Sequence, residues 1–257
     1  MRFFLLVLTL LPFSLQADPF VEAVHVAVRL VGEGASGTGF LVKAGEDRII
    51  LATAAHVFDD LKGETCQVIF RHPKESGGFE RTPIELTIRK GEEVLWKRHP
   101  KHDIAIIEIV IPEKAAVRPV DLDQLAPEGM AKKGEIGVGR EVCIPCFPVG
   151  TEANEAGWPV LRRGTVATHP LTPLAEAETF FVDVSSFGGE SGAPVVAWKG
   201  DKVFVIGVVS SMQRQTEKSK TALEEKTTHL PMGLGIVVQS PFLRDMIAQM
   251  VKNPSKE

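Results

Sequence analysis

The feature that most constrains the fold of this chain is a succession of short β-rich segments separated by turn residues. Runs rich in valine, isoleucine, threonine and phenylalanine recur through most of the chain, and clusters of glycine, proline and charged residues separate them. Many short strands with turns at regular spacing are typical of all-β barrels. The sequence therefore predicts an all-β protein, and it contains no internal repeat.

Two pairs of these runs are close enough along the chain to form hairpins. Residues 37–42 and 48–53 make the first pair, and residues 195–198 and 203–209 make the second. A first strand is expected over residues 23–31. The end of the chain differs, because an amphipathic helix is predicted there with its apolar residues on one side: Phe242, Leu243, Met246, Ile247 and Met250.

A segment rich in proline, glutamate and lysine divides the chain into two halves. It covers residues 112–138 and carries little apolar periodicity. We therefore expect an N-terminal barrel over about residues 22–112, a C-terminal barrel over about residues 138–240, and a closing helix over residues 241–252.

The first 17 residues have the pattern of a secretory signal peptide. Arg2 provides the charged start, residues 3–11 form the apolar centre, and Ala17 is a small residue at a plausible cleavage position. The apolar run is too short for a membrane-spanning helix, and no other run approaches its length. We expect an exported protein, periplasmic or extracellular, with residues 18–257 as the mature chain and no membrane association after cleavage.

The charge gives no reason to expect a nucleic-acid partner. The formal net charge is −4, and no run rich in lysine or arginine is present. No feature of the sequence specifies an oligomeric state.

Three cysteines are an odd number for an exported chain. Cys143 and Cys146 form a C-x-x-C motif, but residues 142–147 are predicted as a strand, which would hold them about 10 Å apart on opposite faces. A zinc site would need a fourth ligand that the sequence does not place. We interpret the cysteines as buried small residues, with at most one disulfide, to Cys66, and expect no metal.

A glycine-rich turn around Ser191 is the strongest candidate for chemistry. Residues 185–196 read Ser-Ser-Phe-Gly-Gly-Glu-Ser-Gly-Ala-Pro-Val-Val. Glycines let backbone N–H groups converge without a Cβ in the way. If the N–H groups of Gly189 and Ser191 point the same way, they form an oxyanion hole. Taken alone, such a segment is more typical of a plain β-turn that enters a strand.

Two further polar residues stand at the ends of predicted strands. His56 follows the second strand of the first hairpin, and small alanines around it leave room for the imidazole to face a cleft. Asp103 stands at the mouth of the apolar run 104–109. Each alone is also typical of a surface or turn residue. With Ser191 they supply the base and the orienting carboxylate that a serine hydroxyl needs to become a nucleophile.

Together these segments resemble the chymotrypsin-fold serine peptidases, and within them the HtrA/Deg-like branch most. The resemblance covers roughly residues 22–252, and its motifs are specific only through their joint occurrence in the right order. The matching segments are Gly37-Thr38-Gly39-Phe40, Thr53-Ala54-Ala55-His56-Val57, Asp103-Ile104-Ala105 and Gly189-Glu190-Ser191-Gly192-Ala193-Pro194. The resemblance implies two perpendicular six-stranded antiparallel β-barrels with a catalytic triad between them.

The resemblance also implies roles for individual residues and no cofactor. His56 would be the general base, Asp103 its orienting carboxylate and Ser191 the nucleophile, with the N–H groups of Gly189 and Ser191 as the oxyanion hole. Since no carboxylate stands at the pocket base, we expect a small or medium apolar P1 residue rather than Arg or Lys. The residues implied for the substrate pocket are Ser185, Val209, Ser210, Ser211 and Gly235.

The sequence departs from the family pattern next to the serine. Glu190 stands where digestive-type enzymes have an Asp that pairs with a freshly cut N-terminus, and no Ile-Val-Gly-Gly-like start is present here. Glu190 therefore needs another partner or solvent, and an oxyanion hole that is misformed at rest is one expectation. Ala193 replaces the usual second glycine, and we expect no PDZ domain after the closing helix.

Residues 212–230 are polar, charged and without a recognisable pattern. Beside the predicted pocket, we interpret them as a mobile loop that shapes or blocks substrate entry, or as a solvated insertion with no role. For the whole chain, the sequence favours a serine endopeptidase that acts on protein or peptide substrates. The alternatives are a peptide-binding module without catalysis and a protease that cuts only itself or one partner.

Overall fold

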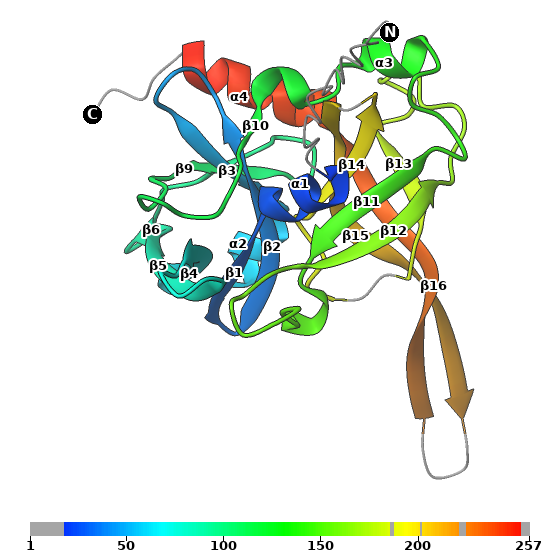
Figure 1. Ribbon diagram of the computed structural model, residues 1–257. Coiled ribbons are helices and arrows are strands. Elements are labelled where there is room, and N and C mark those ends of the chain that lie inside the picture. Colours follow the sequence, from blue (N-terminus) through cyan, green and yellow to red (C-terminus); the bar gives the residue numbers. More distant parts are fainter. Residues whose placement is uncertain (1–17, 186–187, 201, 221–224, 253–257) are drawn as a thin grey trace, which may run out of the picture.

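The computed structural model describes residues 18–185, 188–200, 202–220 and 225–252. The predicted signal peptide therefore lies outside the described residues. Figure 1 shows two β-rich halves side by side, with helix α4 (Ser240–Lys252) packed along one end of both. The predicted all-β fold with a C-terminal helix is confirmed.

The N-terminal half forms one sheet of eight strands. Seven of them follow the order β5-β4-β1-β2-β3-β9-β8, and β10 pairs in parallel with β2. The hairpin predicted over residues 37–42 and 48–53 is confirmed as β2 and β3. The strands are β1 (Ala27–Glu33), β2 (Ala35–Lys43), β3 (Ile49–Thr53), β4 (Lys62–Pro73), β5 (Phe79–Thr87), β8 (Lys97–Arg98), β9 (Ala105–Glu108) and β10 (Val120–Asp121), with β6 (Arg89–Lys90) and β7 (Glu93–Val94) as a separate pair.

The C-terminal half is a closed six-stranded barrel in the order β11-β12-β13-β16-β15-β14. The predicted second hairpin is confirmed as β14 and the first part of β15. The strands are β11 (Glu141–Cys146), β12 (Val160–Val166), β13 (Thr179–Asp183), β14 (Pro194–Lys199), β15 (Lys202–Lys220) and β16 (Glu225–Gln239). The short helices η1 (Leu122–Gln124), α3 (Glu128–Lys132) and η2 (Pro148–Gly150) lie before β11 or between β11 and β12.

The three largest apolar clusters among the described residues hold the fold together. One lies within the sheet and one within the barrel. The third joins both halves, because it contains Phe40 from the sheet, Val208 from the barrel, and Leu243 and Ile247 from α4. These four side chains are fully buried, and burial of each is worth about 1.5–3 kcal/mol. The amphipathic closing helix predicted from the sequence therefore fixes one half against the other.

The first predicted strand begins later than expected. Residues 23–26 belong to helix α1 (Pro19–Val26), and only Ala27 starts β1. Asp18 caps this helix by accepting a hydrogen bond from the Phe20 N–H at 2.9 Å, and Pro19 stands at its first turn. The Asp18 cap and Pro19 favour the start of a helix here, although the valines of residues 21–26 alone indicate a strand.

The interpretation of residues 212–230 as a patternless loop is wrong. Strands β15 and β16 pair in antiparallel register from Gly207↔Gln239 out to Lys220↔Glu225, and their outer part projects from the barrel as a two-stranded ribbon (Figure 1). Most side chains described in this ribbon are exposed. A strand pair with both faces in solvent has no apolar alternation, so the periodicity that reveals a half-buried strand is missing.

The three cysteines are buried and free. Cys143 and Cys146 lie on β11, as the predicted strand requires, and the disulfide to Cys66 that the sequence left open does not form. Burial raises the pKa of Cys66 and Cys146 to about 12 and that of Cys143 to about 11. At neutral pH all three are therefore uncharged thiols of low reactivity.

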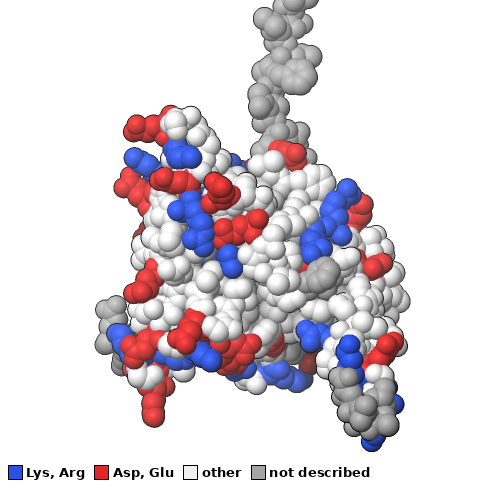
Figure 2. Space-filling view, turned by 90° about the horizontal axis from the view of Figure 1, so that it is seen from below, with Lys and Arg blue, Asp and Glu red and all other residues white. Residues whose placement is uncertain are grey.

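The surface mixes both signs of charge. Figure 2 shows blue and red side chains interspersed on the face seen from below, without a large patch of one sign. Such a face favours no strongly charged partner. No helix in the described ranges is long and apolar enough to cross a membrane.

Candidate active site

His56 and Asp103 are brought together by the pairing of two strands. His56 lies in helix α2 (Ala55–Asp60), directly after β3, and Asp103 precedes β9. Strands β3 and β9 are antiparallel, with Thr53 opposite Ala105. The end of one strand therefore meets the beginning of the other, and both side chains emerge at the same edge of the sheet.

Asp103 accepts three hydrogen bonds. Its Oδ2 lies 2.7 Å from Nδ1 of His56 and accepts a bond from the Ser210 hydroxyl at 2.6 Å. Its Oδ1 accepts the backbone N–H of His56 at 3.0 Å. The carboxylate is thus held from three sides, and it fixes the imidazole with Nδ1 toward the protein and Nε2 free to face a reactant.

The pair perturbs the pKa of both groups. The hydrogen bond to Asp103 raises the pKa of His56 above its ordinary 6.5, and burial opposes this rise only in part. Burial by itself would raise the pKa of Asp103, but bonds from the His56 side chain, Ser210 and the His56 backbone together lower it to about 2. Asp103 is therefore ionised at any pH near neutrality.

Ser191 comes from the other half of the molecule and meets the pair through Ser210. The hydroxyl of Ser191 donates to the carbonyl oxygen of Ser210 at 3.3 Å, while the hydroxyl of Ser210 is bonded to Asp103. The backbone carbonyl of Ser191 accepts the N–H of Thr38 at 3.0 Å, which ties the serine to strand β2. The structure thus gathers His56, Asp103 and Ser191 into one site between the two halves.

The turn around Ser191 requires its glycines. Gly189 and Gly192 have φ values of +88° and +84°, a region that favours glycine. A Cβ on Gly189 would lie 2.5 Å from the carbonyl oxygen of Phe147, and one on Gly192 would lie 2.1 Å from that of Thr38. Residues 186 and 187 of the predicted segment lie outside the described residues.

A protein-family model described as a trypsin-like peptidase domain matches residues 37–220, a span that contains His56, Asp103 and Ser191. The chain belongs to the trypsin-like peptidase family. It is a serine peptidase by family, and no curated protein matches it in sequence.

Two solved structures share the fold of this trypsin-like peptidase. One is an inactive form of the Rv3671c protein of M. tuberculosis that carries a serine-to-alanine change, with 17% identity, 95% of each chain covered and a TM-score of 0.53. The other is described as the Rv3671c protease in an inactive form, with 19% identity, 91% of this chain and 94% of that chain covered, and a TM-score of 0.52.

Thr38 organises the serine turn of the peptidase, a role that the sequence analysis missed. Its hydroxyl donates to the carbonyl oxygen of Gly189 at 2.9 Å and accepts the N–H of Phe147 at 3.2 Å. Its own carbonyl accepts the Thr53 hydroxyl at 2.7 Å. The sequence shows only that this threonine lies between two glycines, in Gly37-Thr38-Gly39, and its complete burial is seen only in the folded chain.

Val149 fixes the peptide group before Gly189. Its N–H donates to the carbonyl oxygen of Gly188 at 2.6 Å. Since the N–H and C=O of a trans peptide point in opposite directions, the N–H of Gly189 points away from η2. Val149 itself has φ +50°, which is costly for a β-branched residue. The turn thus stores backbone strain at Val149, which orients the N–H group predicted from the sequence as an oxyanion-hole donor.

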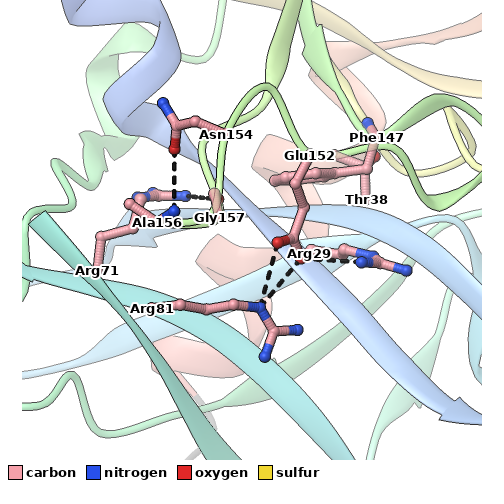
Figure 3. A network of polar contacts seen from close by, with 9 residues as sticks. All are labelled: Arg29, Thr38, Arg71, Arg81, Phe147, Glu152, Asn154, Ala156 and Gly157. Carbon is pink, nitrogen blue, oxygen red and sulfur yellow. Dashed lines mark hydrogen bonds and ion pairs between the residues drawn. The ribbon is translucent and has the colours of Figure 1, made fainter.

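A charged network anchors the segment after η2 to the N-terminal sheet (Figure 3). The carboxylate of Glu152 accepts bonds from Arg29 of β1 at 2.8 Å and from Arg81 of β5 at 3.2 Å. The fully buried Arg71 of β4 donates to the carbonyl oxygens of Gly157 and Ala27 at 3.1 and 2.9 Å. Three strands of the sheet therefore hold the segment that directly follows Val149 and η2.

Glu190 forms an ion pair with a residue that the sequence did not indicate. Its side chain is 2% exposed, and its Oε1 lies 2.5 Å from Nε of Arg162 on β12. The separation of 28 residues, and the absence of any motif around Arg162, left no sequence signal for this pair.

Four of the residues predicted for the substrate pocket lie on β15 or β16, and Ser185 follows β13. Val209 is buried in the barrel, and the hydroxyl of Ser210 is committed to Asp103. Ser185 and Ser211 are exposed. Gly235 is paired with Val182 on one side and Met212 on the other. Ser210 therefore uses both its hydroxyl and its carbonyl oxygen within the site, through Asp103 and Ser191.

Proposed function

We propose that this chain is a serine endopeptidase in which Ser191 is the nucleophile, His56 the general base and Asp103 the carboxylate that orients His56. The observation that carries the proposal is the Asp103 carboxylate, which holds Nδ1 of His56 at 2.7 Å in a site that also contains Ser191. Structure and family support this assignment together, because the same fold elements hold all three groups.

The reaction begins with rotation of the Ser191 hydroxyl away from the Ser210 carbonyl toward Nε2 of His56. His56 removes the proton while Ser191 Oγ attacks the peptide carbonyl carbon, and the carbonyl oxygen takes up negative charge in the site formed by the N–H groups of Gly189 and Ser191. Protonated His56 then gives its proton to the departing amine as the C–N bond breaks. Water repeats these steps on the acyl-enzyme and releases the acid.

Labelling with a fluorophosphonate tests the proposal directly. The probe reacts only with a serine that has an active base and an oxyanion hole, so we expect labelling of the mature protein and none of Ser191→Ala. Absence of labelling in the folded parent protein would contradict the proposal and favour a peptide-binding module. Mass spectrometry of the protein after incubation, alone and with casein, separates a general protease from one that cuts only itself.

Activity is expected to fall as the pH decreases through a value above 6.5. His56 acts as a base only when neutral, and its bond to Asp103 raises its pKa above that ordinary value. The acidic limb of the kcat/KM profile for a small ester substrate should therefore have its midpoint above pH 6.5. A flat profile between pH 5 and 8 would contradict the role of His56.

We propose a small or medium apolar P1 residue as the preferred substrate side chain. The residue at the expected pocket base, Ser185, carries no charge that would attract Arg or Lys. Comparison of peptides with Val, Leu or Arg at P1 tests this proposal, and a clear preference for Arg would overturn it.

The ribbon formed by the outer parts of β15 and β16 is proposed to border the path of protein substrates. Its base, where Met212 pairs with Gly235, adjoins the predicted pocket. Replacing residues 215–230 with an Asn-Gly turn, which suits a two-residue hairpin, should raise KM for casein several-fold. Hydrolysis of a small ester by the shortened variant should stay unchanged. If the variant and the parent protein have the same kinetics on casein as well as on the ester, the ribbon plays no part.

We further propose that the protein is exported and acts in the periplasm or outside the cell. The proposal rests on the pattern of residues 1–17. N-terminal sequencing of the protein recovered from each cell fraction tests it, with a mature start at about residue 18 expected in an exported fraction. Retention of residues 1–17 in the cytoplasm would overturn it.

A further inference from the structure

The buried charge nearest to the serine belongs to Glu190, which lies between Gly189 and Ser191 in the chain. Its side chain is 2% exposed, and its Oε1 contacts Nε of Arg162 at 2.5 Å. A carboxylate that is removed from water needs a counter-charge to remain ionised. The position of Arg162 therefore decides where the Glu190 side chain can lie, and with it the backbone on either side.

Arg162 is itself held on a rigid support. It lies on β12 and pairs in register with Ile144 of β11, within the closed barrel. Its guanidinium also contacts the buried thiol of Cys146, whose pKa is raised to about 12 by burial. Because that thiol stays neutral, it does not compete with Glu190 for the positive charge.

Two other contacts of the turn 188–192 fix backbone carbonyl oxygens rather than the Glu190 side chain. Thr38 holds the carbonyl oxygen of Gly189, and Val149 holds that of Gly188. Glu190 is the only residue of the turn 188–192 with a charged side chain, and its ion pair fixes the turn from the barrel side. Thr38 of the sheet and Val149 of η2 fix backbone atoms on the N-terminal side of Glu190 in the chain.

We propose that Arg162 is a positioning residue that keeps the turn 188–192 ready for catalysis. By holding Glu190, it aims the N–H groups of Gly189 and Ser191 at one point without a newly cut chain terminus. The inference rests on the proposed peptidase function. It makes the oxyanion hole a permanent feature of the folded chain, independent of any processing step.

The test compares Arg162→Gln with Arg163→Gln. Arg163 is the next residue on the same strand, but its side chain is 61% exposed and pairs with Glu141 at the surface, so its replacement should change nothing. Arg162→Gln should lower kcat for a small ester about 10²- to 10³-fold, the effect of losing one oxyanion donor. KM should change less than threefold, and Arg162→Lys should recover most of kcat.

The double variant Arg162→Gln/Glu190→Gln keeps the test decisive if the single variant does not fold. It removes both charges and leaves no buried ion without a partner, so it should fold, with kcat below that of the parent. A double variant, or a folded Arg162→Gln variant, with the kcat of Arg163→Gln would overturn the proposal.

Hydrogen exchange separates this inference from the proposed function. Backbone amides of peptides covering residues 185–196 should exchange faster in the folded variant that lacks Arg162 than in Arg163→Gln, whether or not the protein hydrolyses a substrate. Equal exchange rates would overturn the role of Arg162. If the two variants differ in exchange but the parent protein is not labelled by the fluorophosphonate, the peptidase function alone is refuted.

Discussion

Replacing Asp103 with asparagine is expected to lower kcat by about 10⁴-fold while the fold persists, the size of effect seen when a triad aspartate is replaced in other serine proteases. Oδ2 of Asp103 accepts from both Nδ1 of His56 and the hydroxyl of Ser210. An amide has only one oxygen, so its NH₂ group takes either the Oδ2 position, which faces Nδ1 of His56 and the Ser210 hydroxyl, or the Oδ1 position, which faces the backbone N–H of His56. In the first case Nδ1 must become an acceptor and the proton moves to Nε2, where the base is needed. In the second case the NH₂ group opposes the backbone N–H, and one bond to His56 is lost.

The charge change gives a second readout. Asp103→Asn removes the negative charge whose hydrogen bond raises the pKa of His56, so the remaining activity should have its acidic limb at lower pH than in the parent. Ser210→Ala is the matched control, since it removes one bond to the carboxylate but keeps the charge, and it should cost far less activity. Residual kcat in Asp103→Asn equal to that in Ser210→Ala would contradict the orienting role.

The bond between Asp103 and His56 also makes the stability of the folded chain depend on pH. The pKa of Asp103 is lowered to about 2 in the folded chain, against about 3.9 when unfolded. Its contribution to the free energy of unfolding is therefore present above pH 4 and lost as the pH falls toward 2. His56 acts in the opposite sense, because its raised pKa contributes stability below pH 6.5 that is lost at higher pH.

Gly192→Ala is expected to lower the free energy of unfolding by about 3–5 kcal/mol, through steric overlap and an unfavourable φ. The new Cβ would lie 2.1 Å from both the carbonyl oxygen of Thr38 and the hydroxyl oxygen of Thr53, and both threonines are fully buried. These atoms belong to the sheet and Gly192 to the barrel, so the overlap forces the two halves apart. For a chain of this size, Tm should fall by roughly 6–20 °C.

Gly188→Ala provides the control for this measurement. It lies in the same turn, but a Cβ there would meet nothing within 4 Å. Thermal melts followed by circular dichroism should therefore show little change for Gly188→Ala and a large drop for Gly192→Ala. Similar Tm values for the two variants would mean that the junction between the halves is softer than these distances indicate.

Local patterns in the sequence predicted the parts of the fold that contribute most to the core. The strands of hairpins β2–β3 and β14–β15 are almost continuously buried, and they appear in the sequence as short apolar runs bounded by turn residues. Helix α4 buries one side, and its apolar residues recur with the period of a helix. Helix α1 was missed because its eight residues include three valines, which favour a strand. The ribbon was missed because strands with two exposed faces carry no such pattern.

The candidate site also contains residues that a local motif predicts and residues that only contacts between distant segments define. Ser191, Gly189 and Gly192 sit in one short motif, so their proximity is a local property of the chain. His56 and Asp103 come from separate segments, and only a resemblance to known peptidases linked them. Thr38 and Arg162 act through contacts with residues that are 151 and 28 positions away, and no local pattern specifies such partners.

The way in which the barrel closes also bears on the synthesis of the protein. Strand β16 completes the ring between β13 and β15, and α4, which follows at once, packs against both halves. His56, Asp103 and Ser191 all precede β16 in the chain, so they are synthesised before the strand that closes the barrel. Because the turn that carries Ser191 is built on that barrel, we expect the site to take its final geometry only once β16 and α4 have been synthesised and packed.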